Sequence, residues 1–250
     1  MTTKAIAIIA GVGPGTGAAC ARRFARAYPV VLLARNPSNF ESLVTEINKS
    51  GGSALGISTD VSDAHSVQSA FQNIQKEYGE GVAAAAAIFN ASGPFQRKPL
   101  LEMTPDEFEQ SWQVSCKGAL IFAQASLPLL LNHTKSTTSN ATHPPTLIFT
   151  GATASVKANA RMSSFASSKF ALRALSTSIA KEFAPQGVHV AHAVIDGVID
   201  IPRTKDWLKD MPAEAKIGAD DIAESYWNLH TQGKRCFTNE IDIRPMLEKW

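Results

Sequence analysis

Short apolar runs alternate with longer segments of helical periodicity along most of the chain. The apolar runs are rich in alanine or β-branched residues, and they predict strands at Ala5–Ala10, Val30–Ala34, Ala54–Ser58, Ala84–Asn90, Thr146–Thr150 and His189–Ile195. The segments between them predict helices at Gly17–Ala27, Phe40–Ser50, Ser62–Tyr78, Thr104–Leu131 and Ser163–Ala184. This alternation is typical of a parallel sheet with helices on both faces, and right-handed crossovers then favour a doubly wound α/β fold, the Rossmann architecture.

The composition is that of a globular protein with a large core. Hydrophobic residues make up 44% of the chain and charged residues 18%, which excludes a disordered protein. The 250 residues fit one domain over residues 1–250. Residues 198–220, which include Pro202, Pro212 and Gly218, follow the sixth predicted strand at the end where such sheets bind ligands. We expect them to cover a substrate.

Charge and cysteine usage narrow the partners and the compartment. The 24 Lys and Arg residues and the 22 Asp and Glu residues are scattered, so we expect neither nucleic acid nor an anionic membrane as a partner. The first apolar run is too short for a signal peptide or a membrane span. Cys20, Cys116 and Cys236 form no Cys-x-x-Cys pair, which argues against disulfides and a metal site. A cytoplasmic protein is therefore expected.

A glycine-rich stretch lies directly between the first predicted strand and the first predicted helix. Its residues are Gly11, Gly13, Pro14, Gly15, Thr16 and Gly17. Glycines let the backbone approach a pyrophosphate, and the helix N-terminus offers unpaired N–H groups to it. A tight turn without a ligand is the alternative interpretation. The order of strand, turn and helix favours a dinucleotide site.

The second predicted strand ends at Arg35 and Asn36. An acidic residue near this position would hold the ribose 2′-hydroxyl of NAD, whereas arginine can pair with the 2′-phosphate of NADP. Arg35 therefore predicts NADP(H) as the cofactor. The alternative is a solvated arginine at the end of a strand.

Four short segments in this order resemble the short-chain dehydrogenase/reductase family, over nearly the whole chain. They are Gly11-x-x-x-Gly15-Thr16-Gly17, Asp60-Val61, Asn90-Ala91-Ser92-Gly93 and Lys169. The resemblance implies that Asp60 and Val61 contact the adenine, that Asn90, Ala91, Ser92 and Gly93 line the back wall of the cofactor site, and that Lys169 reaches the nicotinamide ribose. It also implies that the loop at Gly197 and Val198 contacts the nicotinamide amide. Family members commonly pair through the two long helices, so a homodimer or homotetramer is expected.

The same resemblance implies that three of the family's four catalytic residues are replaced. Phe165 stands where the family has its tyrosine acid, and Ala152 stands at the serine position, with Thr153 next to it. Ser115 takes the place of the asparagine, so only Lys169 is retained. An exposed helix lysine is the alternative interpretation of Lys169.

Helical periodicity predicts that no polar side chain on the same helix face replaces the missing acid. Ala166, Phe165 and Met162 precede Lys169 by three, four and seven residues, so the helix face beside the lysine is predicted to be apolar. A positioned general acid contributes roughly 10²- to 10⁴-fold in rate, and its absence disfavours reduction of ordinary ketones. Other proton sources remain open, namely Thr153, Ser155, Asp200, His192 or bound water.

Three functions follow from this combination. The first is an NADPH-dependent oxidoreductase for a small electrophile that needs no strong acid, such as an iminium or an activated alkene. The second is an NADP(H)-bound sensor or binding protein without turnover. The third is a non-redox cyclase or isomerase that acts by positioning its substrate. The retained cofactor segments favour the first.

Overall fold

The computed structural model describes residues 5–135 and 143–249, and a parallel sheet forms its centre. The strands of this sheet are β1 (Ile6–Ala10), β2 (Val30–Ala34), β3 (Ala54–Ser58), β4 (Ala84–Phe89), β5 (Thr146–Thr150), β6 (His189–Ile195) and β9 (Glu240–Ile243). They lie in the order β3-β2-β1-β4-β5-β6-β9, and every neighbouring pair is parallel. The predicted doubly wound α/β fold is confirmed.

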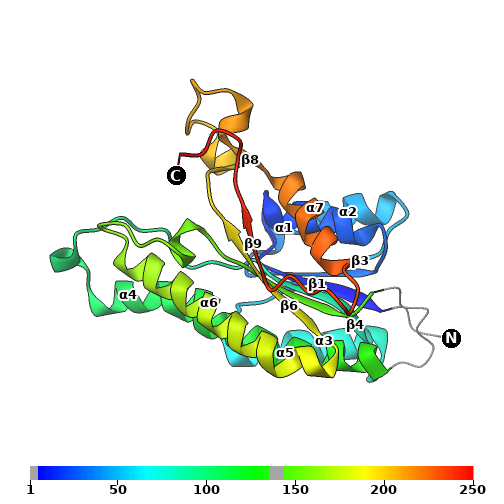
Figure 1. The fold of residues 1–250 in the computed structure, drawn as a ribbon. Helices are drawn as coiled ribbons and strands as arrows, with labels where there is room; N and C mark the ends of the chain where they lie inside the picture. The colour runs from blue at the N-terminus through cyan, green and yellow to red at the C-terminus, as the bar shows by residue number, and fades with distance from the viewer. Residues whose placement is uncertain (1–4, 136–142, 250) are drawn as a thin grey trace.

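Helices cover both faces of the sheet (Figure 1). One layer contains α1 (Thr16–Ala25), α2 (Glu41–Lys49) and α7 (Ala219–His230). The other contains α3 (Ala64–Tyr78), α5 (Gly118–Lys135) and α6 (Ser163–Phe183), with α4 (Pro105–Trp112) packed against α6. Short 3-10 turns lie at Pro37–Asn39, Leu100–Glu102, Thr153–Ser155, Ala184–Gln186, Pro202–Thr204 and Ala213–Ala215.

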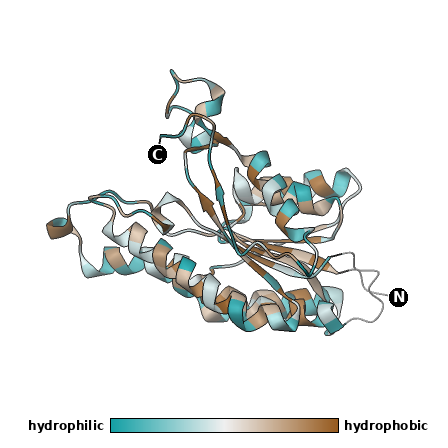
Figure 2. Cartoon of the chain, in the orientation of Figure 1, coloured by the Kyte–Doolittle hydropathy of each residue, from teal (hydrophilic) through white to brown (hydrophobic). Residues whose placement is uncertain are grey.

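Each face of the sheet has its own hydrophobic core, because both faces of a parallel sheet are covered. Strand β1 shows the alternation: Ile6 and Ile8 belong to the core beneath α3, α5 and α6, whereas Ala7 and Ile9 belong to the core beneath α1, α2 and α7. The central strands are accordingly brown or pale along their length, and teal is concentrated on the outer helices and loops (Figure 2). The alanine and β-branched runs of the sequence are thus the double-faced strands of the sheet.

The helix predicted over Thr104–Leu131 is interrupted, which corrects the sequence interpretation. Helix α4 ends at Trp112, a π-helical turn occupies Gln113–Lys117, and α5 then begins at Gly118. By length and composition, Pro105–Lys135 could cross a membrane, but half of its most apolar stretch is buried within the molecule, as in a core helix. The π-helical turn carries Ser115, and such turns often occur at functional sites.

Strand β9 was not predicted from the sequence. Its four residues, Glu240–Ile243, alternate charged and apolar side chains over a run too short to distinguish from a loop. Residues 198–220 contain β7 (Ile199–Asp200) and β8 (Ile217–Gly218), which pair in parallel apart from the main sheet. This segment reaches the glycine-rich loop, because a Cβ built on Gly15 would lie 2.7 Å from Cγ2 of Ile201.

Candidate active site at the carboxyl edge of the sheet

The predicted site residues follow the carboxyl ends of six neighbouring strands, or lie on the helices beside them. Each of the six loops contributes at least one of these residues. In chain order, the loops carry Gly11, Arg35, Asp60, Asn90, Ala152 and Gly197. Because the strands are parallel, these loops share one edge of the sheet, which is where doubly wound folds bind ligands.

The loops after β1 and β4 are in direct contact. Gly11 has a φ of +87°, and a Cβ on it would lie 2.3 Å from the backbone N of Ala91. The side-chain Nδ2 of Asn90 donates a 2.9 Å hydrogen bond to the carbonyl oxygen of Gly11. Only glycine meets both requirements at this position, since it tolerates positive φ and leaves space for the second loop.

The N-terminus of α1 fits a phosphate group. The helix follows Pro14 and Gly15 with no side-chain cap and no acidic residue in its first turn, and a Cβ on Gly13 would meet no atom within 4 Å. The Oγ1 of Thr16 is buried and has no hydrogen-bond partner among the described residues. A buried hydroxyl without a partner is costly, and a phosphate oxygen would satisfy it together with the free N–H groups of the helix. Gly17 is buried in the same turn.

Arg35 and Asp60 lie near each other at the ends of β2 and β3. Burial raises the pKa of Asp60, but hydrogen bonds from Ser62 N at 2.9 Å and Ser62 Oγ at 2.6 Å, with the positive charge of Arg35, outweigh it and lower the pKa overall. The side chain of Asn36 caps the following 3-10 turn, because its Oδ1 accepts a hydrogen bond from Ser38 N.

Val61, which the resemblance assigned to the adenine, lies in the core. It is buried, and its backbone oxygen would be 3.1 Å from a Cβ on Gly118. Only its backbone and the neighbouring Asp60 are therefore suited to a nucleotide contact.

A cavity of about 790 Å³ joins the Arg35 end of the site to the loop after β4. Its lining includes Arg35, Ser62, Ser92, Gly93, Phe95 and Arg203. Neither Arg35 nor Arg203 has an ion-pair partner within 4.0 Å in the described part of the chain. Two unpaired guanidinium groups on one cavity suit a phosphorylated ligand.

Lys169 is a buried residue at the centre of the site and not an exposed helix lysine. Its side chain on α6 is 3% exposed, and its Nζ donates a 3.0 Å hydrogen bond to the carbonyl oxygen of Thr150 at the end of β5. Burial lowers the pKa of Lys169 to about 8. The hydroxyl of Thr150 accepts a 2.8 Å hydrogen bond from Tyr226 on the opposite face of the sheet. The ammonium group has three protons, and among the described residues Thr150 is the one acceptor within direct hydrogen-bond distance.

The wall beside Lys169 is apolar, as helical periodicity predicted. Phe165 is 8% exposed and packs in a small cluster with Ala154 and Ala166 and with the partly buried Ala152 and Met162. Its ring centroid lies 5.8 Å from the Lys169 Nζ. The ring of Phe95, which sequence analysis missed, meets it edge-on at 5.2 Å between centroids. No hydroxyl group stands at the tyrosine position.

The nearby hydroxyl groups are committed to structural hydrogen bonds. Ser115 Oγ accepts from Gly93 N at 3.0 Å, and Ser155 Oγ accepts from Ala152 N at 3.1 Å. Thr153 Oγ1 donates to the Asp196 carboxylate at 2.5 Å. The geometry therefore leaves Thr153 as a hydrogen-bond acceptor for any further partner.

Asp196 fixes the loop that contains Gly197 and Val198. Its Oδ2 pairs with Arg244 at 2.9 Å, and the Val198 oxygen accepts from Ile217 N at 2.8 Å. Asp200, another candidate proton source, is 63% exposed and lies 3.5 Å from Lys216. Arg244 follows β9, a strand that the sequence pattern did not predict. Its ion pair with Asp196 could therefore not be predicted from the sequence.

His192, one of the candidate proton sources, is buried on β6 with only one of its two ring nitrogens hydrogen-bonded to a described residue. It is 1% exposed, and its Nδ1 bonds Oε2 of Glu240 at 3.0 Å, but its Nε2 is buried without a partner among the described residues. Burial, opposed by Glu240, lowers the pKa of His192 to about 4. Glu240 in turn receives two hydrogen bonds from Arg173, at 2.6 and 2.7 Å.

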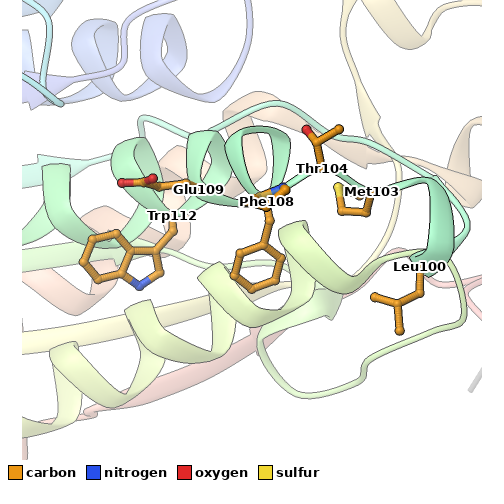
Figure 3. A pocket seen from close by; sticks show the side chains of 7 residues that line it. Leu100, Met103, Thr104, Phe108, Glu109 and Trp112 are labelled. Atoms are coloured by element: carbon orange, nitrogen blue, oxygen red, sulfur yellow. The ribbon is translucent and has the colours of Figure 1, made fainter.

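A second cavity, of about 520 Å³, lies beside α4 and is lined by none of the predicted site residues (Figure 3). Its lining is mainly apolar: Leu100, Met103, Thr104, Pro105, Phe108, Glu109 and Trp112. Phe108 and Trp112 are 40% and 39% exposed. Figure 3 shows both rings projecting from α4 toward the neighbouring helix.

The fold and the arrangement of loops at its carboxyl edge define an α/β protein of the Rossmann class. The model of the short chain dehydrogenase family matches residues 5–212. The chain belongs to that family. Among curated proteins, it is 25% identical to an uncharacterized oxidoreductase of Staphylococcus aureus strain USA300 and 24% identical to one of Staphylococcus epidermidis strain ATCC 12228, covering 98% and 96% of this chain and 98% and 97% of the relatives.

Solved structures share the fold. A short-chain dehydrogenase from Rhodopseudomonas palustris is 29% identical, with a TM-score of 0.78 and coverage of 96% of this chain and 98% of that one. A metagenomic short-chain oxidoreductase in complex with NADP and an alcohol dehydrogenase from Thermococcus sibiricus complexed with 5-hydroxy-NADP are each 23% identical, with TM-scores of 0.78 and 0.81. In both cases 98% of each chain is covered.

Proposed function

We propose that this protein is an NADPH-dependent oxidoreductase that reduces a small-molecule electrophile needing no strong acid, such as an iminium or an activated alkene. The observation that carries the proposal is Phe165. It occupies the position of the family's tyrosine, against Phe95 and beside the buried Lys169. The cofactor segments are retained while the proton-donating group is absent.

Several features support NADP(H) as the cofactor. The unpartnered Thr16 hydroxyl and the uncapped α1 N-terminus would hold the pyrophosphate, and Arg35 on its cavity would hold the 2′-phosphate. A proton of the Lys169 ammonium that is not bonded to Thr150 would bind a hydroxyl of the nicotinamide ribose. Two neighbours of the same fold were solved with NADP or a derivative of it, which agrees with this assignment.

The proposed mechanism follows from what the side chains can and cannot do. When bound, NADPH supplies a hydride from its nicotinamide ring. The apolar wall of Phe165, Phe95 and Met162 would shield a substrate bound beside Lys169 from water. In an iminium, the hydride forms a new C–H bond and the C=N π pair becomes the nitrogen lone pair, so a neutral amine results without proton transfer. A ketone would instead need a proton, and loss of the acid adds roughly 3–5 kcal/mol to its barrier.

Consumption of NADPH with a panel of cyclic iminiums, activated alkenes and simple ketones tests the proposal. We expect turnover with one of the first two groups and slow reaction with ketones. Lys169→Met should raise the NADPH dissociation constant and abolish turnover, whereas Lys181→Met, an exposed lysine on the same helix, should do neither. Brisk ketone reduction would refute the altered-site mechanism.

The alternatives give different results in the same experiment. Tight NADPH binding without turnover of any electrophile would favour the sensor. Conversion of a substrate without NADPH consumption would favour a cyclase or isomerase. The binding measurement therefore distinguishes a failed substrate choice from a failed cofactor assignment.

We further propose that the protein is a homodimer or homotetramer that pairs through α4, α5 and α6, as the family resemblance implies. Large apolar side chains on these helices support it: Phe108, Trp112, Leu120 and Phe170 are 39–40% exposed. Exposed apolar groups clustered on adjacent elements are typical of interaction surfaces.

A further inference from the structure

The unpartnered Nε2 of His192 lies on the same side of the sheet as Lys169. His192 pairs in register with Phe149 on β5, and Phe149 belongs to the core beneath α5 and α6. A Cβ built on Gly151 would lie 2.3 Å from His192 Nε2, so the imidazole fills the side-chain space of Gly151. The Lys169 Nζ binds the carbonyl oxygen of the preceding residue, Thr150. The two nitrogens thus converge on the end of β5.

The protonation state of His192 follows from its neighbours. The Glu240 carboxylate accepts a hydrogen bond from Nδ1 and is itself fixed by two bonds from Arg173. Nδ1 must therefore carry the proton, and Nε2 of the neutral ring is an acceptor. The charged groups that face His192 are Lys169 and Arg173 from α6 and Glu240 from β9.

We propose that His192 is a positioning residue for Lys169: its Nε2 accepts a hydrogen bond from one buried water that the Lys169 ammonium donates to, and so holds the amine in place for the cofactor ribose. An acceptor buried without a partner is costly, and the ammonium is a nearby donor with protons to spare. The outer links, Glu240 and Arg173, fix the tautomer and the ring orientation.

The relative proton affinities make this a hydrogen bond and not a proton transfer. The pKa of Lys169 is about 8 and that of His192 about 4, both lowered mainly by burial, so the proton stays on the lysine. His192 therefore acts on the orientation and charge of Lys169 and takes no proton during a reaction. The relevance to cofactor binding rests on the proposed function, whereas the contact itself does not.

Two matched substitutions of His192 distinguish the role of Nδ1 from the role of Nε2. His192→Asn keeps a donor at the position of Nδ1 for Glu240 but removes Nε2, whereas His192→Gln can supply an acceptor at the position of Nε2. His189→Asn is the control, because His189 is equally buried on β6 but bonds the Thr238 oxygen at 2.9 Å.

The first readout needs no cofactor or substrate. In ¹⁵N-histidine-labelled protein, we expect the His192 Nε2 resonance to be that of an unprotonated nitrogen that accepts a hydrogen bond, and to shift on Lys169→Met. In ¹³C-lysine-labelled protein, His192→Asn should lower the pKa of Lys169 by about one unit, a tenfold change, because the charged form loses an acceptor. His192→Gln and His189→Asn should leave it within a few tenths.

The second readout is the dissociation constant of NADPH. His192→Asn should weaken binding about tenfold, and His192→Gln less than threefold. A His192 Nε2 resonance that is protonated or unaffected by Lys169→Met would overturn the proposal, as would equal effects of the Asn and Gln variants. Absence of NADPH binding in the unmodified protein would refute the proposed function alone, because the resonance of His192 would still report the contact.

Discussion

The ring of Phe95 meets the ring of Phe165 edge-on, with 5.2 Å between the centroids and 77° between the planes. Phe95 lies on the loop after β4 and is 49% exposed, whereas Phe165 is buried on α6. The pair links the rim of the cavity to the wall beside Lys169. Its edge-to-face geometry is a favourable one for aromatic rings, so the apolar site is a packed structure in its own right.

Restoring a proton donor should require more than one substitution. We expect Phe165→Tyr alone to give little ketone reduction, because Ala152 leaves the substrate oxygen without a second donor. Phe165→Tyr with Ala152→Ser should do better, and adding Ser115→Asn better still, with strongly non-additive gains. NADPH oxidation with small ketones measures this.

Substitution of Arg35 tests whether this residue sets the preference for NADPH over NADH. Arg35→Asp should weaken NADPH binding by about 10- to 100-fold and leave NADH binding equal or stronger, because a charge-assisted contact with the 2′-phosphate is lost. Fluorescence titration with both cofactors gives the ratio. Equal dissociation constants in the unmodified protein would contradict the assignment.

Burial of Lys169 should make stability depend on pH. Its pKa falls from 10.5 to about 8 on folding, so between these values the unfolded chain binds more protons and the free energy of unfolding rises with pH. Below pH 8 the full cost of burying the charge is present. The difference in unfolding free energy between the protein and Lys169→Met should change by about 3 kcal/mol from pH 7.5 to 10.5 in favour of the unmodified protein. Urea denaturation at both pH values measures it, and Lys181→Met should show no such change.

Gly151 should not tolerate a side chain. A Cβ there would meet His192 Nε2 at 2.3 Å and the Ala193 oxygen at 2.8 Å, so Gly151→Ala should cost about 1–3 kcal/mol of stability. Gly81→Ala, where a Cβ meets nothing within 4 Å, is the control. His192→Ala in the same chain should recover part of the loss, which a double-mutant cycle would quantify.

Assembly should depend on the apolar side chains of α4. Sedimentation at micromolar concentration should give a dimer or tetramer for the unmodified protein and a smaller species for Trp112→Glu. Trp207→Glu should leave the assembly unchanged. Trp207 is 48% exposed, but it lies within residues 198–220 and not on α4, α5 or α6. A monomeric unmodified protein would contradict the proposal.

The sequence predicted the elements whose residues repeat a strong local pattern. The strands that are apolar on both faces, the glycine-rich turn and the apolar wall beside Lys169 all depend on neighbours within a few residues along the chain. The break at Gln113–Lys117 was missed, because a π-helical turn preserves helical composition. Glu240 and Arg244 were missed because their roles arise only when β9 pairs with β6, some 48 residues from His192.

Among the strands that the structure describes, β9 is an edge strand paired with β6 alone, and the charges at its two ends determine its alignment. A slip of one residue would turn Ile241 toward His192, which the alternation of faces forbids. A slip of two residues would keep the faces but place Asp242 opposite His192 and shift Arg244 by about 6–7 Å along the strand, away from Asp196. A slip of two residues would break the bonds of Glu240 to Arg173 and of Arg244 to Asp196. The contacts that shape the site therefore also fix the register of β9 against β6.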